Sequence, residues 1–303
     1  MIGGPENDSG VFCGRDSVGN FYIAGNTDGV IGPGVGLGNR DMFVAKYDSA
    51  GVLQWAHMLA SIGIDSIAHA VVDPSGKLYL AGSVTGPLPG QTFGGGFFDA
   101  FIAKYDTNGV LQWLVQLGTV LESRDYGFGV AVDNFGNVYA DGSAGSDIAG
   151  QGASSGAAAF VVKFNSAGVR QWVARFGDDS AEARAIATYG SAVFVAGRAT
   201  NSIAGNMVSG GRDIFLAKFD AFGSREWIRQ IGSPADDAGN AVFADTNSVY
   251  VTGSAGGPID GQNVTSSSAI VLLSYSHEGV KQWVRATSVL NRGEGNDVAV
   301  TSG

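Results

Sequence analysis

Residues 98–113 read Phe98-Asp-Ala-Phe-Ile-Ala-Lys-Tyr-Asp-Thr-Asn-Gly-Val-Leu-Gln-Trp113, and variants of this stretch recur along the chain. The other copies end at Trp55, Trp172, Trp227 and Trp283, so all five tryptophans hold one repeat position. The copies are about 57 residues apart, and a fixed period in this range is typical of a repeat architecture. The repeat therefore sets the domain organisation, and we expect a single domain over residues 1–303.

Each repeat contains four short apolar runs separated by turns. An Asp-x-x-Gly turn such as Asp133–Gly136 joins the first two runs, and a turn such as Asp106–Gly109 joins the last two. Asp accepts hydrogen bonds within its own turn, and Gly adopts the positive φ that a tight hairpin needs. Runs of this length, rich in Val, Ile, Phe and Tyr, indicate strands, which we call a, b, c and d.

Four antiparallel strands per repeat predict the blades of a β-propeller, which is an all-β fold. A solenoid is the competing architecture, but its repeats are shorter, at about 20–45 residues. Counting strand d gives five blades, and residues 296–300 read as an additional strand a. We expect closure at five blades with this extra C-terminal strand; a segment of a longer propeller array is the alternative.

Residues 125–142 carry the clearest copy of strands a and b, Asp-Tyr-Gly-Phe-Gly-Val-Ala-Val-Asp-Asn-Phe-Gly-Asn-Val-Tyr-Ala-Asp-Gly. Ala-Phe-Val-Val-Lys-Phe-Asn and Gln171-Trp172 follow. This pattern resembles the SBBP family of bacterial β-propeller repeats, and the likeness extends over nearly the whole chain. The resemblance implies a bacterial propeller that is exported or associated with the cell surface. It implies no activity, because the family is defined by its repeat.

Composition excludes several classes of protein. A net charge of −10 without a basic cluster disfavours nucleic acid as a partner. The sequence contains no run of about 18 apolar residues, so it does not predict membrane insertion. Residues 1–6 lack the basic and apolar regions of a signal peptide, although a signal could lie upstream if the chain is a fragment. The single cysteine, Cys13, excludes a disulfide framework, and we expect it to be a small buried core residue.

Acidic residues gather in the connections from strand d to the next strand a. Four of them precede the first turn of their repeats by eight residues and are weak Ca²⁺ candidates: Asp8, Asp65, Asp125 and Asp237. The alternative is that each Asp accepts backbone N–H bonds and caps the turn into strand a. We favour capping, because no Asp-x-Asp-x-Asp-Gly spacing is present, and we expect no other cofactor.

The loops from strand b to strand c share a second pattern. An aliphatic residue follows the last glycine of strand b by six positions, and we expect it to anchor the loop. Three positions later, four of the five loops carry an amide side chain: Gln91, Gln151, Asn206 and Gln262. Amides in polar loops suit the hydroxyl groups of glycans, and repeated sites would add avidity. The alternative is that each amide bonds its own loop.

No arrangement typical of catalysis is evident, so we expect no enzyme activity. Lysines within strand c, such as Lys104, follow the strand-start aspartates by five residues and so lie on the opposite face of the strand, which argues against a catalytic pair. We expect their heads to bond a neighbouring blade. The histidines hold unrelated repeat positions, and no Gly-x-Ser-x-Gly elbow follows a strand and opens a helix. We expect the tryptophans to pack between blades.

Three functions remain. The first is a non-catalytic exported binding or scaffold module, located outside the cell or on its surface, that presents its polar loops to glycans or a protein partner. The second is a structural spacer of a large bacterial surface protein. The third is a glycoside-active enzyme, which would need acids such as Asp179, Glu182 and Asp236 to converge in one pocket. The sequence predicts no oligomeric state.

Overall fold

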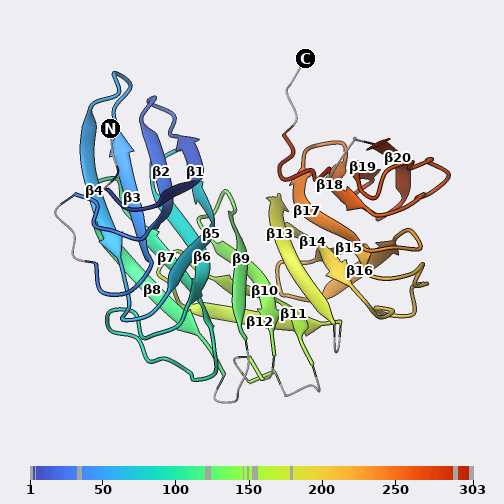
Figure 1. Cartoon of the computed structure of the whole chain (residues 1–303), viewed down its shortest axis with the longest axis horizontal. Coiled ribbons are helices and arrows are strands. Elements are labelled where there is room, and N and C mark those ends of the chain that lie inside the picture. The colour runs from blue at the N-terminus through green and yellow to red at the C-terminus, as the bar shows by residue number, and fades with distance from the viewer. Residues whose placement is uncertain are drawn as a thin grey trace. The chain divides into compact units, whose positions relative to one another are not determined.

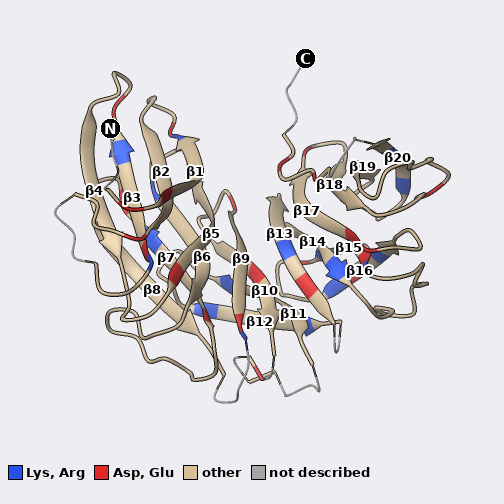
Figure 2. Ribbon diagram, viewed as in Figure 1, with Lys and Arg blue, Asp and Glu red and all other residues tan. Residues whose placement is uncertain are grey.

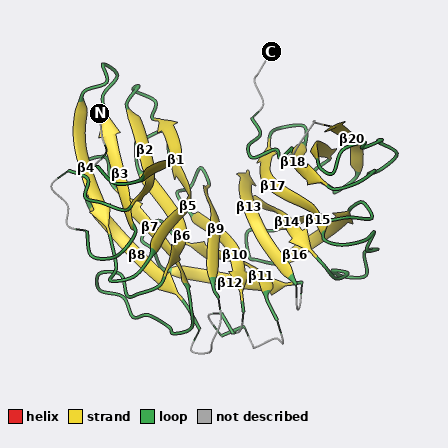
Figure 3. Cartoon of the chain, in the orientation of Figure 1, coloured by secondary structure: helices red, strands yellow, loops and turns green. Residues whose placement is uncertain are grey.

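The computed structural model describes residue 3 and residues 5–32, 36–119, 124–145, 147–148, 150–151, 156–177, 180–288 and 293–299. These residues form strands and loops and no helix (Figure 3). It follows that no described segment is a helix able to cross a membrane.

Within the described residues, twenty strands form five four-stranded antiparallel sheets, each built from consecutive strands (Figure 1). Sheet 1 contains β1 (Asp8–Arg15), β2 (Phe21–Thr27), β3 (Asp41–Tyr47) and β4 (Leu53–Leu59). Sheet 2 contains β5 (Asp65–Val72), β6 (Leu78–Val84), β7 (Asp99–Tyr105) and β8 (Leu111–Leu117). Sheet 3 contains β9 (Tyr126–Val132), β10 (Val138–Ala144), β11 (Ala158–Phe164) and β12 (Arg170–Phe176).

The last two sheets follow the same order. Sheet 4 contains β13 (Ala181–Tyr189), β14 (Ala192–Ala199), β15 (Asp213–Phe219) and β16 (Arg225–Ile231). Sheet 5 contains β17 (Asp237–Ala244), β18 (Val249–Ala255), β19 (Ala269–Tyr275) and β20 (Lys281–Ser288). The predicted all-β fold with four antiparallel strands per repeat is confirmed.

The chain forms two compact units. Unit 1 comprises Met1–Val130, Ala144–Gly152 and Asn165–Val169, and unit 2 comprises Ala131–Ser143, Ala153–Phe164 and Arg170–Gly303. Closure into one ring and a single domain stay predictions. The extra strand was expected over residues 296–300; residues 296–299 form no strand, and Val300 lies outside the described residues. Just before them, the Gly295 amide donates to the Gly253 carbonyl at 2.9 Å.

The aspartate of the first hairpin turn organises that turn. In sheet 3, Asp133 Oδ1 accepts the Phe135 and Asn137 amides, both at 2.9 Å, and Oδ2 accepts the Tyr139 hydroxyl at 3.1 Å. The Gly136 amide closes the turn on the Asp133 carbonyl at 2.9 Å, and Gly136 has a φ of 77°. The predicted roles are therefore confirmed: Asp accepts the hydrogen bonds of the turn, and Gly adopts the positive φ.

We expect Asp133→Ala to destabilise the protein by about 2–3 kcal/mol, because it leaves two backbone amides of the turn and the hydroxyl of the buried Tyr139 without an acceptor. Asn134→Ala is the matched control, since Asn134 is an exposed residue of the same turn. Chemical denaturation followed by tryptophan fluorescence measures both variants. Equal midpoints for the two would contradict this role of Asp133.

Lysine and tryptophan side chains connect consecutive sheets within each unit. In unit 1, Lys104 Nζ and Trp113 Nε1 donate to one acceptor, the Ser166 carbonyl, at 2.8 and 3.2 Å. In unit 2, Lys163 and Trp172 share the Ala221 carbonyl in the same way. The predicted pairing of the lysine heads and packing of the tryptophans are confirmed at these positions.

The first strand of sheet 1 differs from the other first strands. Cys13 is exposed, so the prediction of a buried core residue was wrong. Most of β1 is exposed, whereas the matching positions Ala70 and Val130 are buried at 1% exposure. The repeat pattern does not encode this difference, because burial of a first strand depends on the sheets around it.

Candidate functional site

Strand a of sheets 1, 2, 4 and 5 contains a β-bulge, which changes the direction of one side chain. The extra residues are Val11, Ala68, Arg184 and Asn240. A bulge leaves one residue unpaired and turns its side chain away from the regular alternation. In unit 2 the two polar bulge residues meet, because Arg184 Nη1 donates to Asn240 Oδ1 at 2.7 Å.

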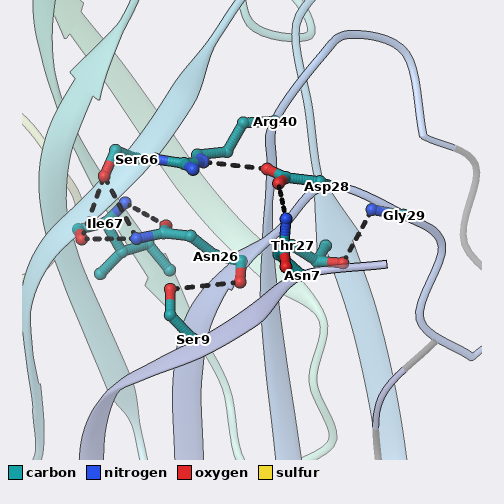
Figure 4. A network of polar contacts seen from close by, with 9 residues as sticks. All are labelled: Asn7, Ser9, Asn26, Thr27, Asp28, Gly29, Arg40, Ser66 and Ile67. Atoms are coloured by element: carbon teal, nitrogen blue, oxygen red, sulfur yellow. Dashed lines mark hydrogen bonds and ion pairs between the residues drawn. The ribbon is translucent and has the colours of Figure 1, made fainter. Parts of the chain in front are cut away.

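A second arginine stands where other repeats carry a small polar residue. In sheet 1 this residue is Asn26, whose Oδ1 accepts the Ile67 amide at 2.8 Å and whose Nδ2 contacts the Ile67 carbonyl at 3.3 Å (Figure 4). Asn26 thus connects sheets 1 and 2. At the matching position of sheet 4, Arg198 Nη2 instead pairs with Glu182 Oε2 at 2.8 Å.

A third arginine precedes β15. The Arg212 amide donates to Asp236 Oδ1 at 3.0 Å, and its carbonyl accepts the Asp237 amide at 2.6 Å. These two bonds hold the backbone of Arg212 against the start of β17.

The three arginines line one cleft of about 370 Å³ within unit 2. Asp236, Asn240, Ser254 and Glu294 are among its other lining residues. Figure 2 shows that β13, which contributes Arg184, carries both basic and acidic positions. The cleft therefore offers donors and acceptors, and its three arginines lie beside the carboxylates of Asp236, Asp237 and Glu294.

Charge interactions within the cleft couple its residues. Burial lowers the pKa of Arg184, and the positive charges of Arg198 and Arg212 act in the same direction, whereas Glu182 and Glu294 oppose them. Arginine remains charged at neutral pH despite such shifts. Glu182 lies 3.9 Å from Arg184 and 2.8 Å from Arg198, so one carboxylate faces two guanidinium groups.

These side chains suit a ligand that is both acidic and hydroxylated. A guanidinium group binds a carboxylate or sulfate through two parallel hydrogen bonds. The amide of Asn240, the hydroxyl of Ser254 and the carboxylates of Asp236 and Glu294 suit hydroxyl groups.

The loop amides predicted as ligand sites belong to loops of four different repeats. Gln91 Oε1 accepts the Gln116 amide at 3.1 Å, and Asn206 Nδ2 donates to the Ile203 carbonyl at 2.7 Å. The backbone amides of Gln151 and Gln262 donate to the carbonyls of Ile148 and Ile259, at 3.2 and 2.8 Å. The predicted anchors are confirmed, since all five aliphatic residues are buried: Ile31, Leu88, Ile148, Ile203 and Ile259. Glycan binding by the amides stays a prediction.

The predicted Ca²⁺ candidates cap turns. Asp237 Oδ2 accepts the Ser233 amide at 2.5 Å, and Oδ1 accepts the Ser233 hydroxyl and the Gly256 amide at 2.9 and 3.0 Å. Asp65 is bonded by the amide and hydroxyl of Ser61, and Asp125 by those of Thr119. Asp8 is exposed at the start of β1. No group of three or more His, Cys, Asp or Glu side chains is arranged as a metal site within the described ranges.

Two of the three acids that would mark an enzyme lie close to each other. Asp236 lines the cleft, and Glu182 is paired with its arginines; Asp179 lies outside the described residues. Glu182 is already engaged by two guanidinium groups, and Asp236 by the Arg212 amide. Glu182 and Asp236 therefore both already have partners that hold them in place.

Sequence reasoning missed the three arginines. The signal was present, because Arg184 and Arg198 depart from the residues that other repeats carry at the same positions. A repeat pattern is defined by the residues that the copies share, so residues in which one copy differs are not part of it.

The fold and the repeat together define an all-β protein of the β-propeller class. The model of the SBBP family, described as a beta-propeller repeat, matches residues 112–149, so the chain carries an SBBP repeat, as the sequence resemblance predicted. The chain is 25% identical over 269 residues to the regulatory protein FlaEY of Caulobacter vibrioides. That match covers 81% of this chain and 26% of FlaEY, so the chain spans about a quarter of this relative.

Solved structures resemble the chain only distantly. The N10 neuraminidase-like protein of A/little yellow-shouldered bat/Guatemala/060/2010 aligns with a TM-score of 0.47 and 10% identity, over 95% of this chain and 87% of that one. The Cellvibrio cellulosa alpha-L-arabinanase aligns with a TM-score of 0.39 and 11% identity, over 93% and 96%. Nothing about the site is carried over from these proteins.

Proposed function

We propose that this protein is a non-catalytic binding module whose arginine-lined cleft holds an acidic saccharide. The observation that carries the proposal is that Arg184, Arg198 and Arg212 line one cleft. An extracellular or cell-surface location is part of the proposal.

The departure from the repeat supports a ligand rather than a structural role. In sheet 1 the residue matching Arg198 connects two sheets through its amide. A structural role would be served by the same residue in sheet 4, whereas an arginine there gives up that connection. What replaces it is a charged group that lines a cleft.

A glycan array that contains neutral, carboxylated and sulfated saccharides tests the proposal. We expect binding to acidic saccharides, and we expect Arg198→Gln or Arg212→Gln to weaken it about 10–100-fold, because a hydrogen bond to a charged group contributes about 1.5–3 kcal/mol. Arg170→Gln is the matched control, since it removes the same charge from an exposed position at the start of β12.

Two results would contradict the proposal. Equal losses in Arg170→Gln and Arg198→Gln would indicate a general charge effect rather than a site. Absence of binding to any acidic saccharide would favour the structural spacer. Product analysis of each bound saccharide distinguishes binding from hydrolysis, and released sugar would establish the enzyme alternative.

A further inference from the structure

A second polar pocket lies within unit 2, between sheets 4 and 5. Its volume is about 410 Å³, which is in the range that small molecules occupy, and it shares no described lining residue with the arginine-lined cleft. β16 of sheet 4 contributes Arg229 and Gln230. Sheet 5 and its loop from strand b to strand c contribute Asp260, Tyr275 and Lys281.

Tyr275 brings a buried hydroxyl group to this pocket. The residue is 3% exposed and lines the pocket. Burial raises the pKa of Tyr275 to about 12; the negative charge of Asp260 adds to the effect, and the positive charge of Arg229 opposes it. The hydroxyl therefore keeps its proton at neutral pH, and no residue in the described part of the chain accepts that proton. A buried donor without an acceptor costs free energy, and a ligand in the pocket would supply the acceptor.

Arg229 is held by backbone atoms and keeps donors for a ligand. Its Nε donates to the Gly279 carbonyl at 2.7 Å, and its Nη1 donates to the Ile228 carbonyl at 2.9 Å. The guanidinium group lies over the Trp227 ring, 5.5 Å from its centroid. These contacts fix the orientation of the guanidinium group and use only part of its N–H donors.

The pocket carries a positive charge that its own residues do not balance. Lys281 and Asp260 form an ion pair. Asp260 is the only acid among the described lining residues, whereas Arg229 and Lys281 are both positive. One positive charge is therefore left in a protein whose net charge is −10. Free N–H and O–H donors beside an unbalanced positive charge suit an anion.

This combination of side chains is confined to one junction between consecutive sheets. At the other three junctions, the position of Arg229 holds His57, Val115 or Ala174, and the position of Asp260 holds Pro89, Ala149 or Ala204. A cation recurs only at the position of Lys281, in sheets 3 and 4. The other sheets pack without Arg229 and Asp260 at these positions, so their presence beside Tyr275 points to a ligand rather than to packing.

We infer that this pocket binds an oxyanion, which is the phosphate or carboxylate group of a small molecule. Arg229 supplies charged donors, Tyr275 donates its hydroxyl, and Lys281 adds a second positive charge. A guanidinium group binds either kind of oxyanion through parallel hydrogen bonds. The inference is independent of the proposed saccharide site, because none of these three residues lines the arginine-lined cleft.

Titration of the ¹⁵N-labelled full chain with sodium phosphate, and separately with sodium acetate, tests the inference at constant ionic strength. The indole N–H signal of Trp227 is a local readout, since Arg229 lies over this ring. We expect a saturable shift of this signal, and the anion that binds more tightly identifies the group that the ligand carries. Tyr275→Phe should weaken binding about 10–100-fold, because it removes a hydrogen bond to a charged group.

Two variants serve as controls. Tyr105→Phe removes the same hydroxyl from the matching position of sheet 2, where Tyr105 is also 3% exposed, and should leave the affinity unchanged. Arg198→Gln should also leave the shift of the Trp227 signal unchanged, which separates this pocket from the arginine-lined cleft. We expect Tyr275→Phe to fold, because sheets 3 and 4 carry phenylalanine at this position.

Two results would overturn the inference. The first is the absence of a saturable shift of the Trp227 signal with either anion at millimolar concentration. The second is equal affinity in wild-type protein and in Tyr275→Phe, since the hydroxyl would then take no part in binding. Neither result bears on the acidic saccharide, which is absent from these titrations.

Discussion

Phe215→Ala is expected to destabilise the protein by about 3–5 kcal/mol. Phe215 is fully buried in the core of unit 2, where its ring packs edge-on against Phe176 with centroids 5.5 Å apart. Its ring also covers Gly197, at whose position a Cβ atom would lie 2.8 Å away. Alanine would leave a cavity that β14 and β15 cannot close, because their hydrogen-bonded register fixes their separation.

Phe222→Ala is the matched control for this substitution. Phe222 belongs to the hairpin turn that follows β15 and is 84% exposed, so its removal should change stability by less than about 0.5 kcal/mol. Chemical denaturation of both variants measures the difference. A similar midpoint for Phe215→Ala and Phe222→Ala would show that the core of sheet 4 does not depend on this ring.

Gly82→Ala is expected to destabilise the protein by about 3 kcal/mol through overpacking. A Cβ atom at this position would overlap the Ser66 carbonyl oxygen and lie 2.7 Å from the Phe101 ring. The cause is steric contact with the backbone of β5, because Ser66 lies beside the bulge at Ala68. The same crowding by the carbonyl of strand a recurs at Gly25, Gly197 and Gly253, which explains the last glycine of strand b.

Gly10→Ala provides the control for Gly82→Ala. Gly10 also lies in a strand, and a Cβ atom there would meet nothing within 4 Å. We expect this variant to be neutral or slightly stabilising, since alanine has less conformational freedom to lose on folding. Equal destabilisation in both variants would indicate that strand glycines matter for a reason other than contact with the neighbouring strand.

The arginine-lined cleft is formed by residues in which one repeat differs from the others, whereas the buried aspartates at the junctions between sheets recur. Arg184 and Arg198 occur in one repeat and create a single position of distinct chemistry. Buried aspartates at the starts of strand c and of the next strand a, such as Asp213 and Asp237, recur at three junctions between sheets. A binding site formed by departures from a repeat can change without disturbing contacts that the other repeats share.

The sequence by itself predicted the strands, the turns and the four-stranded unit. These features depend on neighbours in the chain: Asp133 and Gly136 close their turn without help from distant residues. The anchors such as Leu88 and the inter-sheet lysines such as Lys104 were also predictable, because each repeat restates them. The burial of Cys13 was mispredicted, since it depends on the sheets that pack around β1.

Only the tertiary structure decided which residues of different strands meet. The sequence predicted Asp213 as the start of a strand and Asp237 as a turn cap. That they lie at one junction follows from the bond of the Asp237 amide to the Arg212 carbonyl. Arg184 enters the cleft because a bulge turns its side chain out of the regular alternation of β13. A local pattern specifies conformation, whereas a site needs contacts between segments that are far apart in the chain, and those are set when the sheets pack.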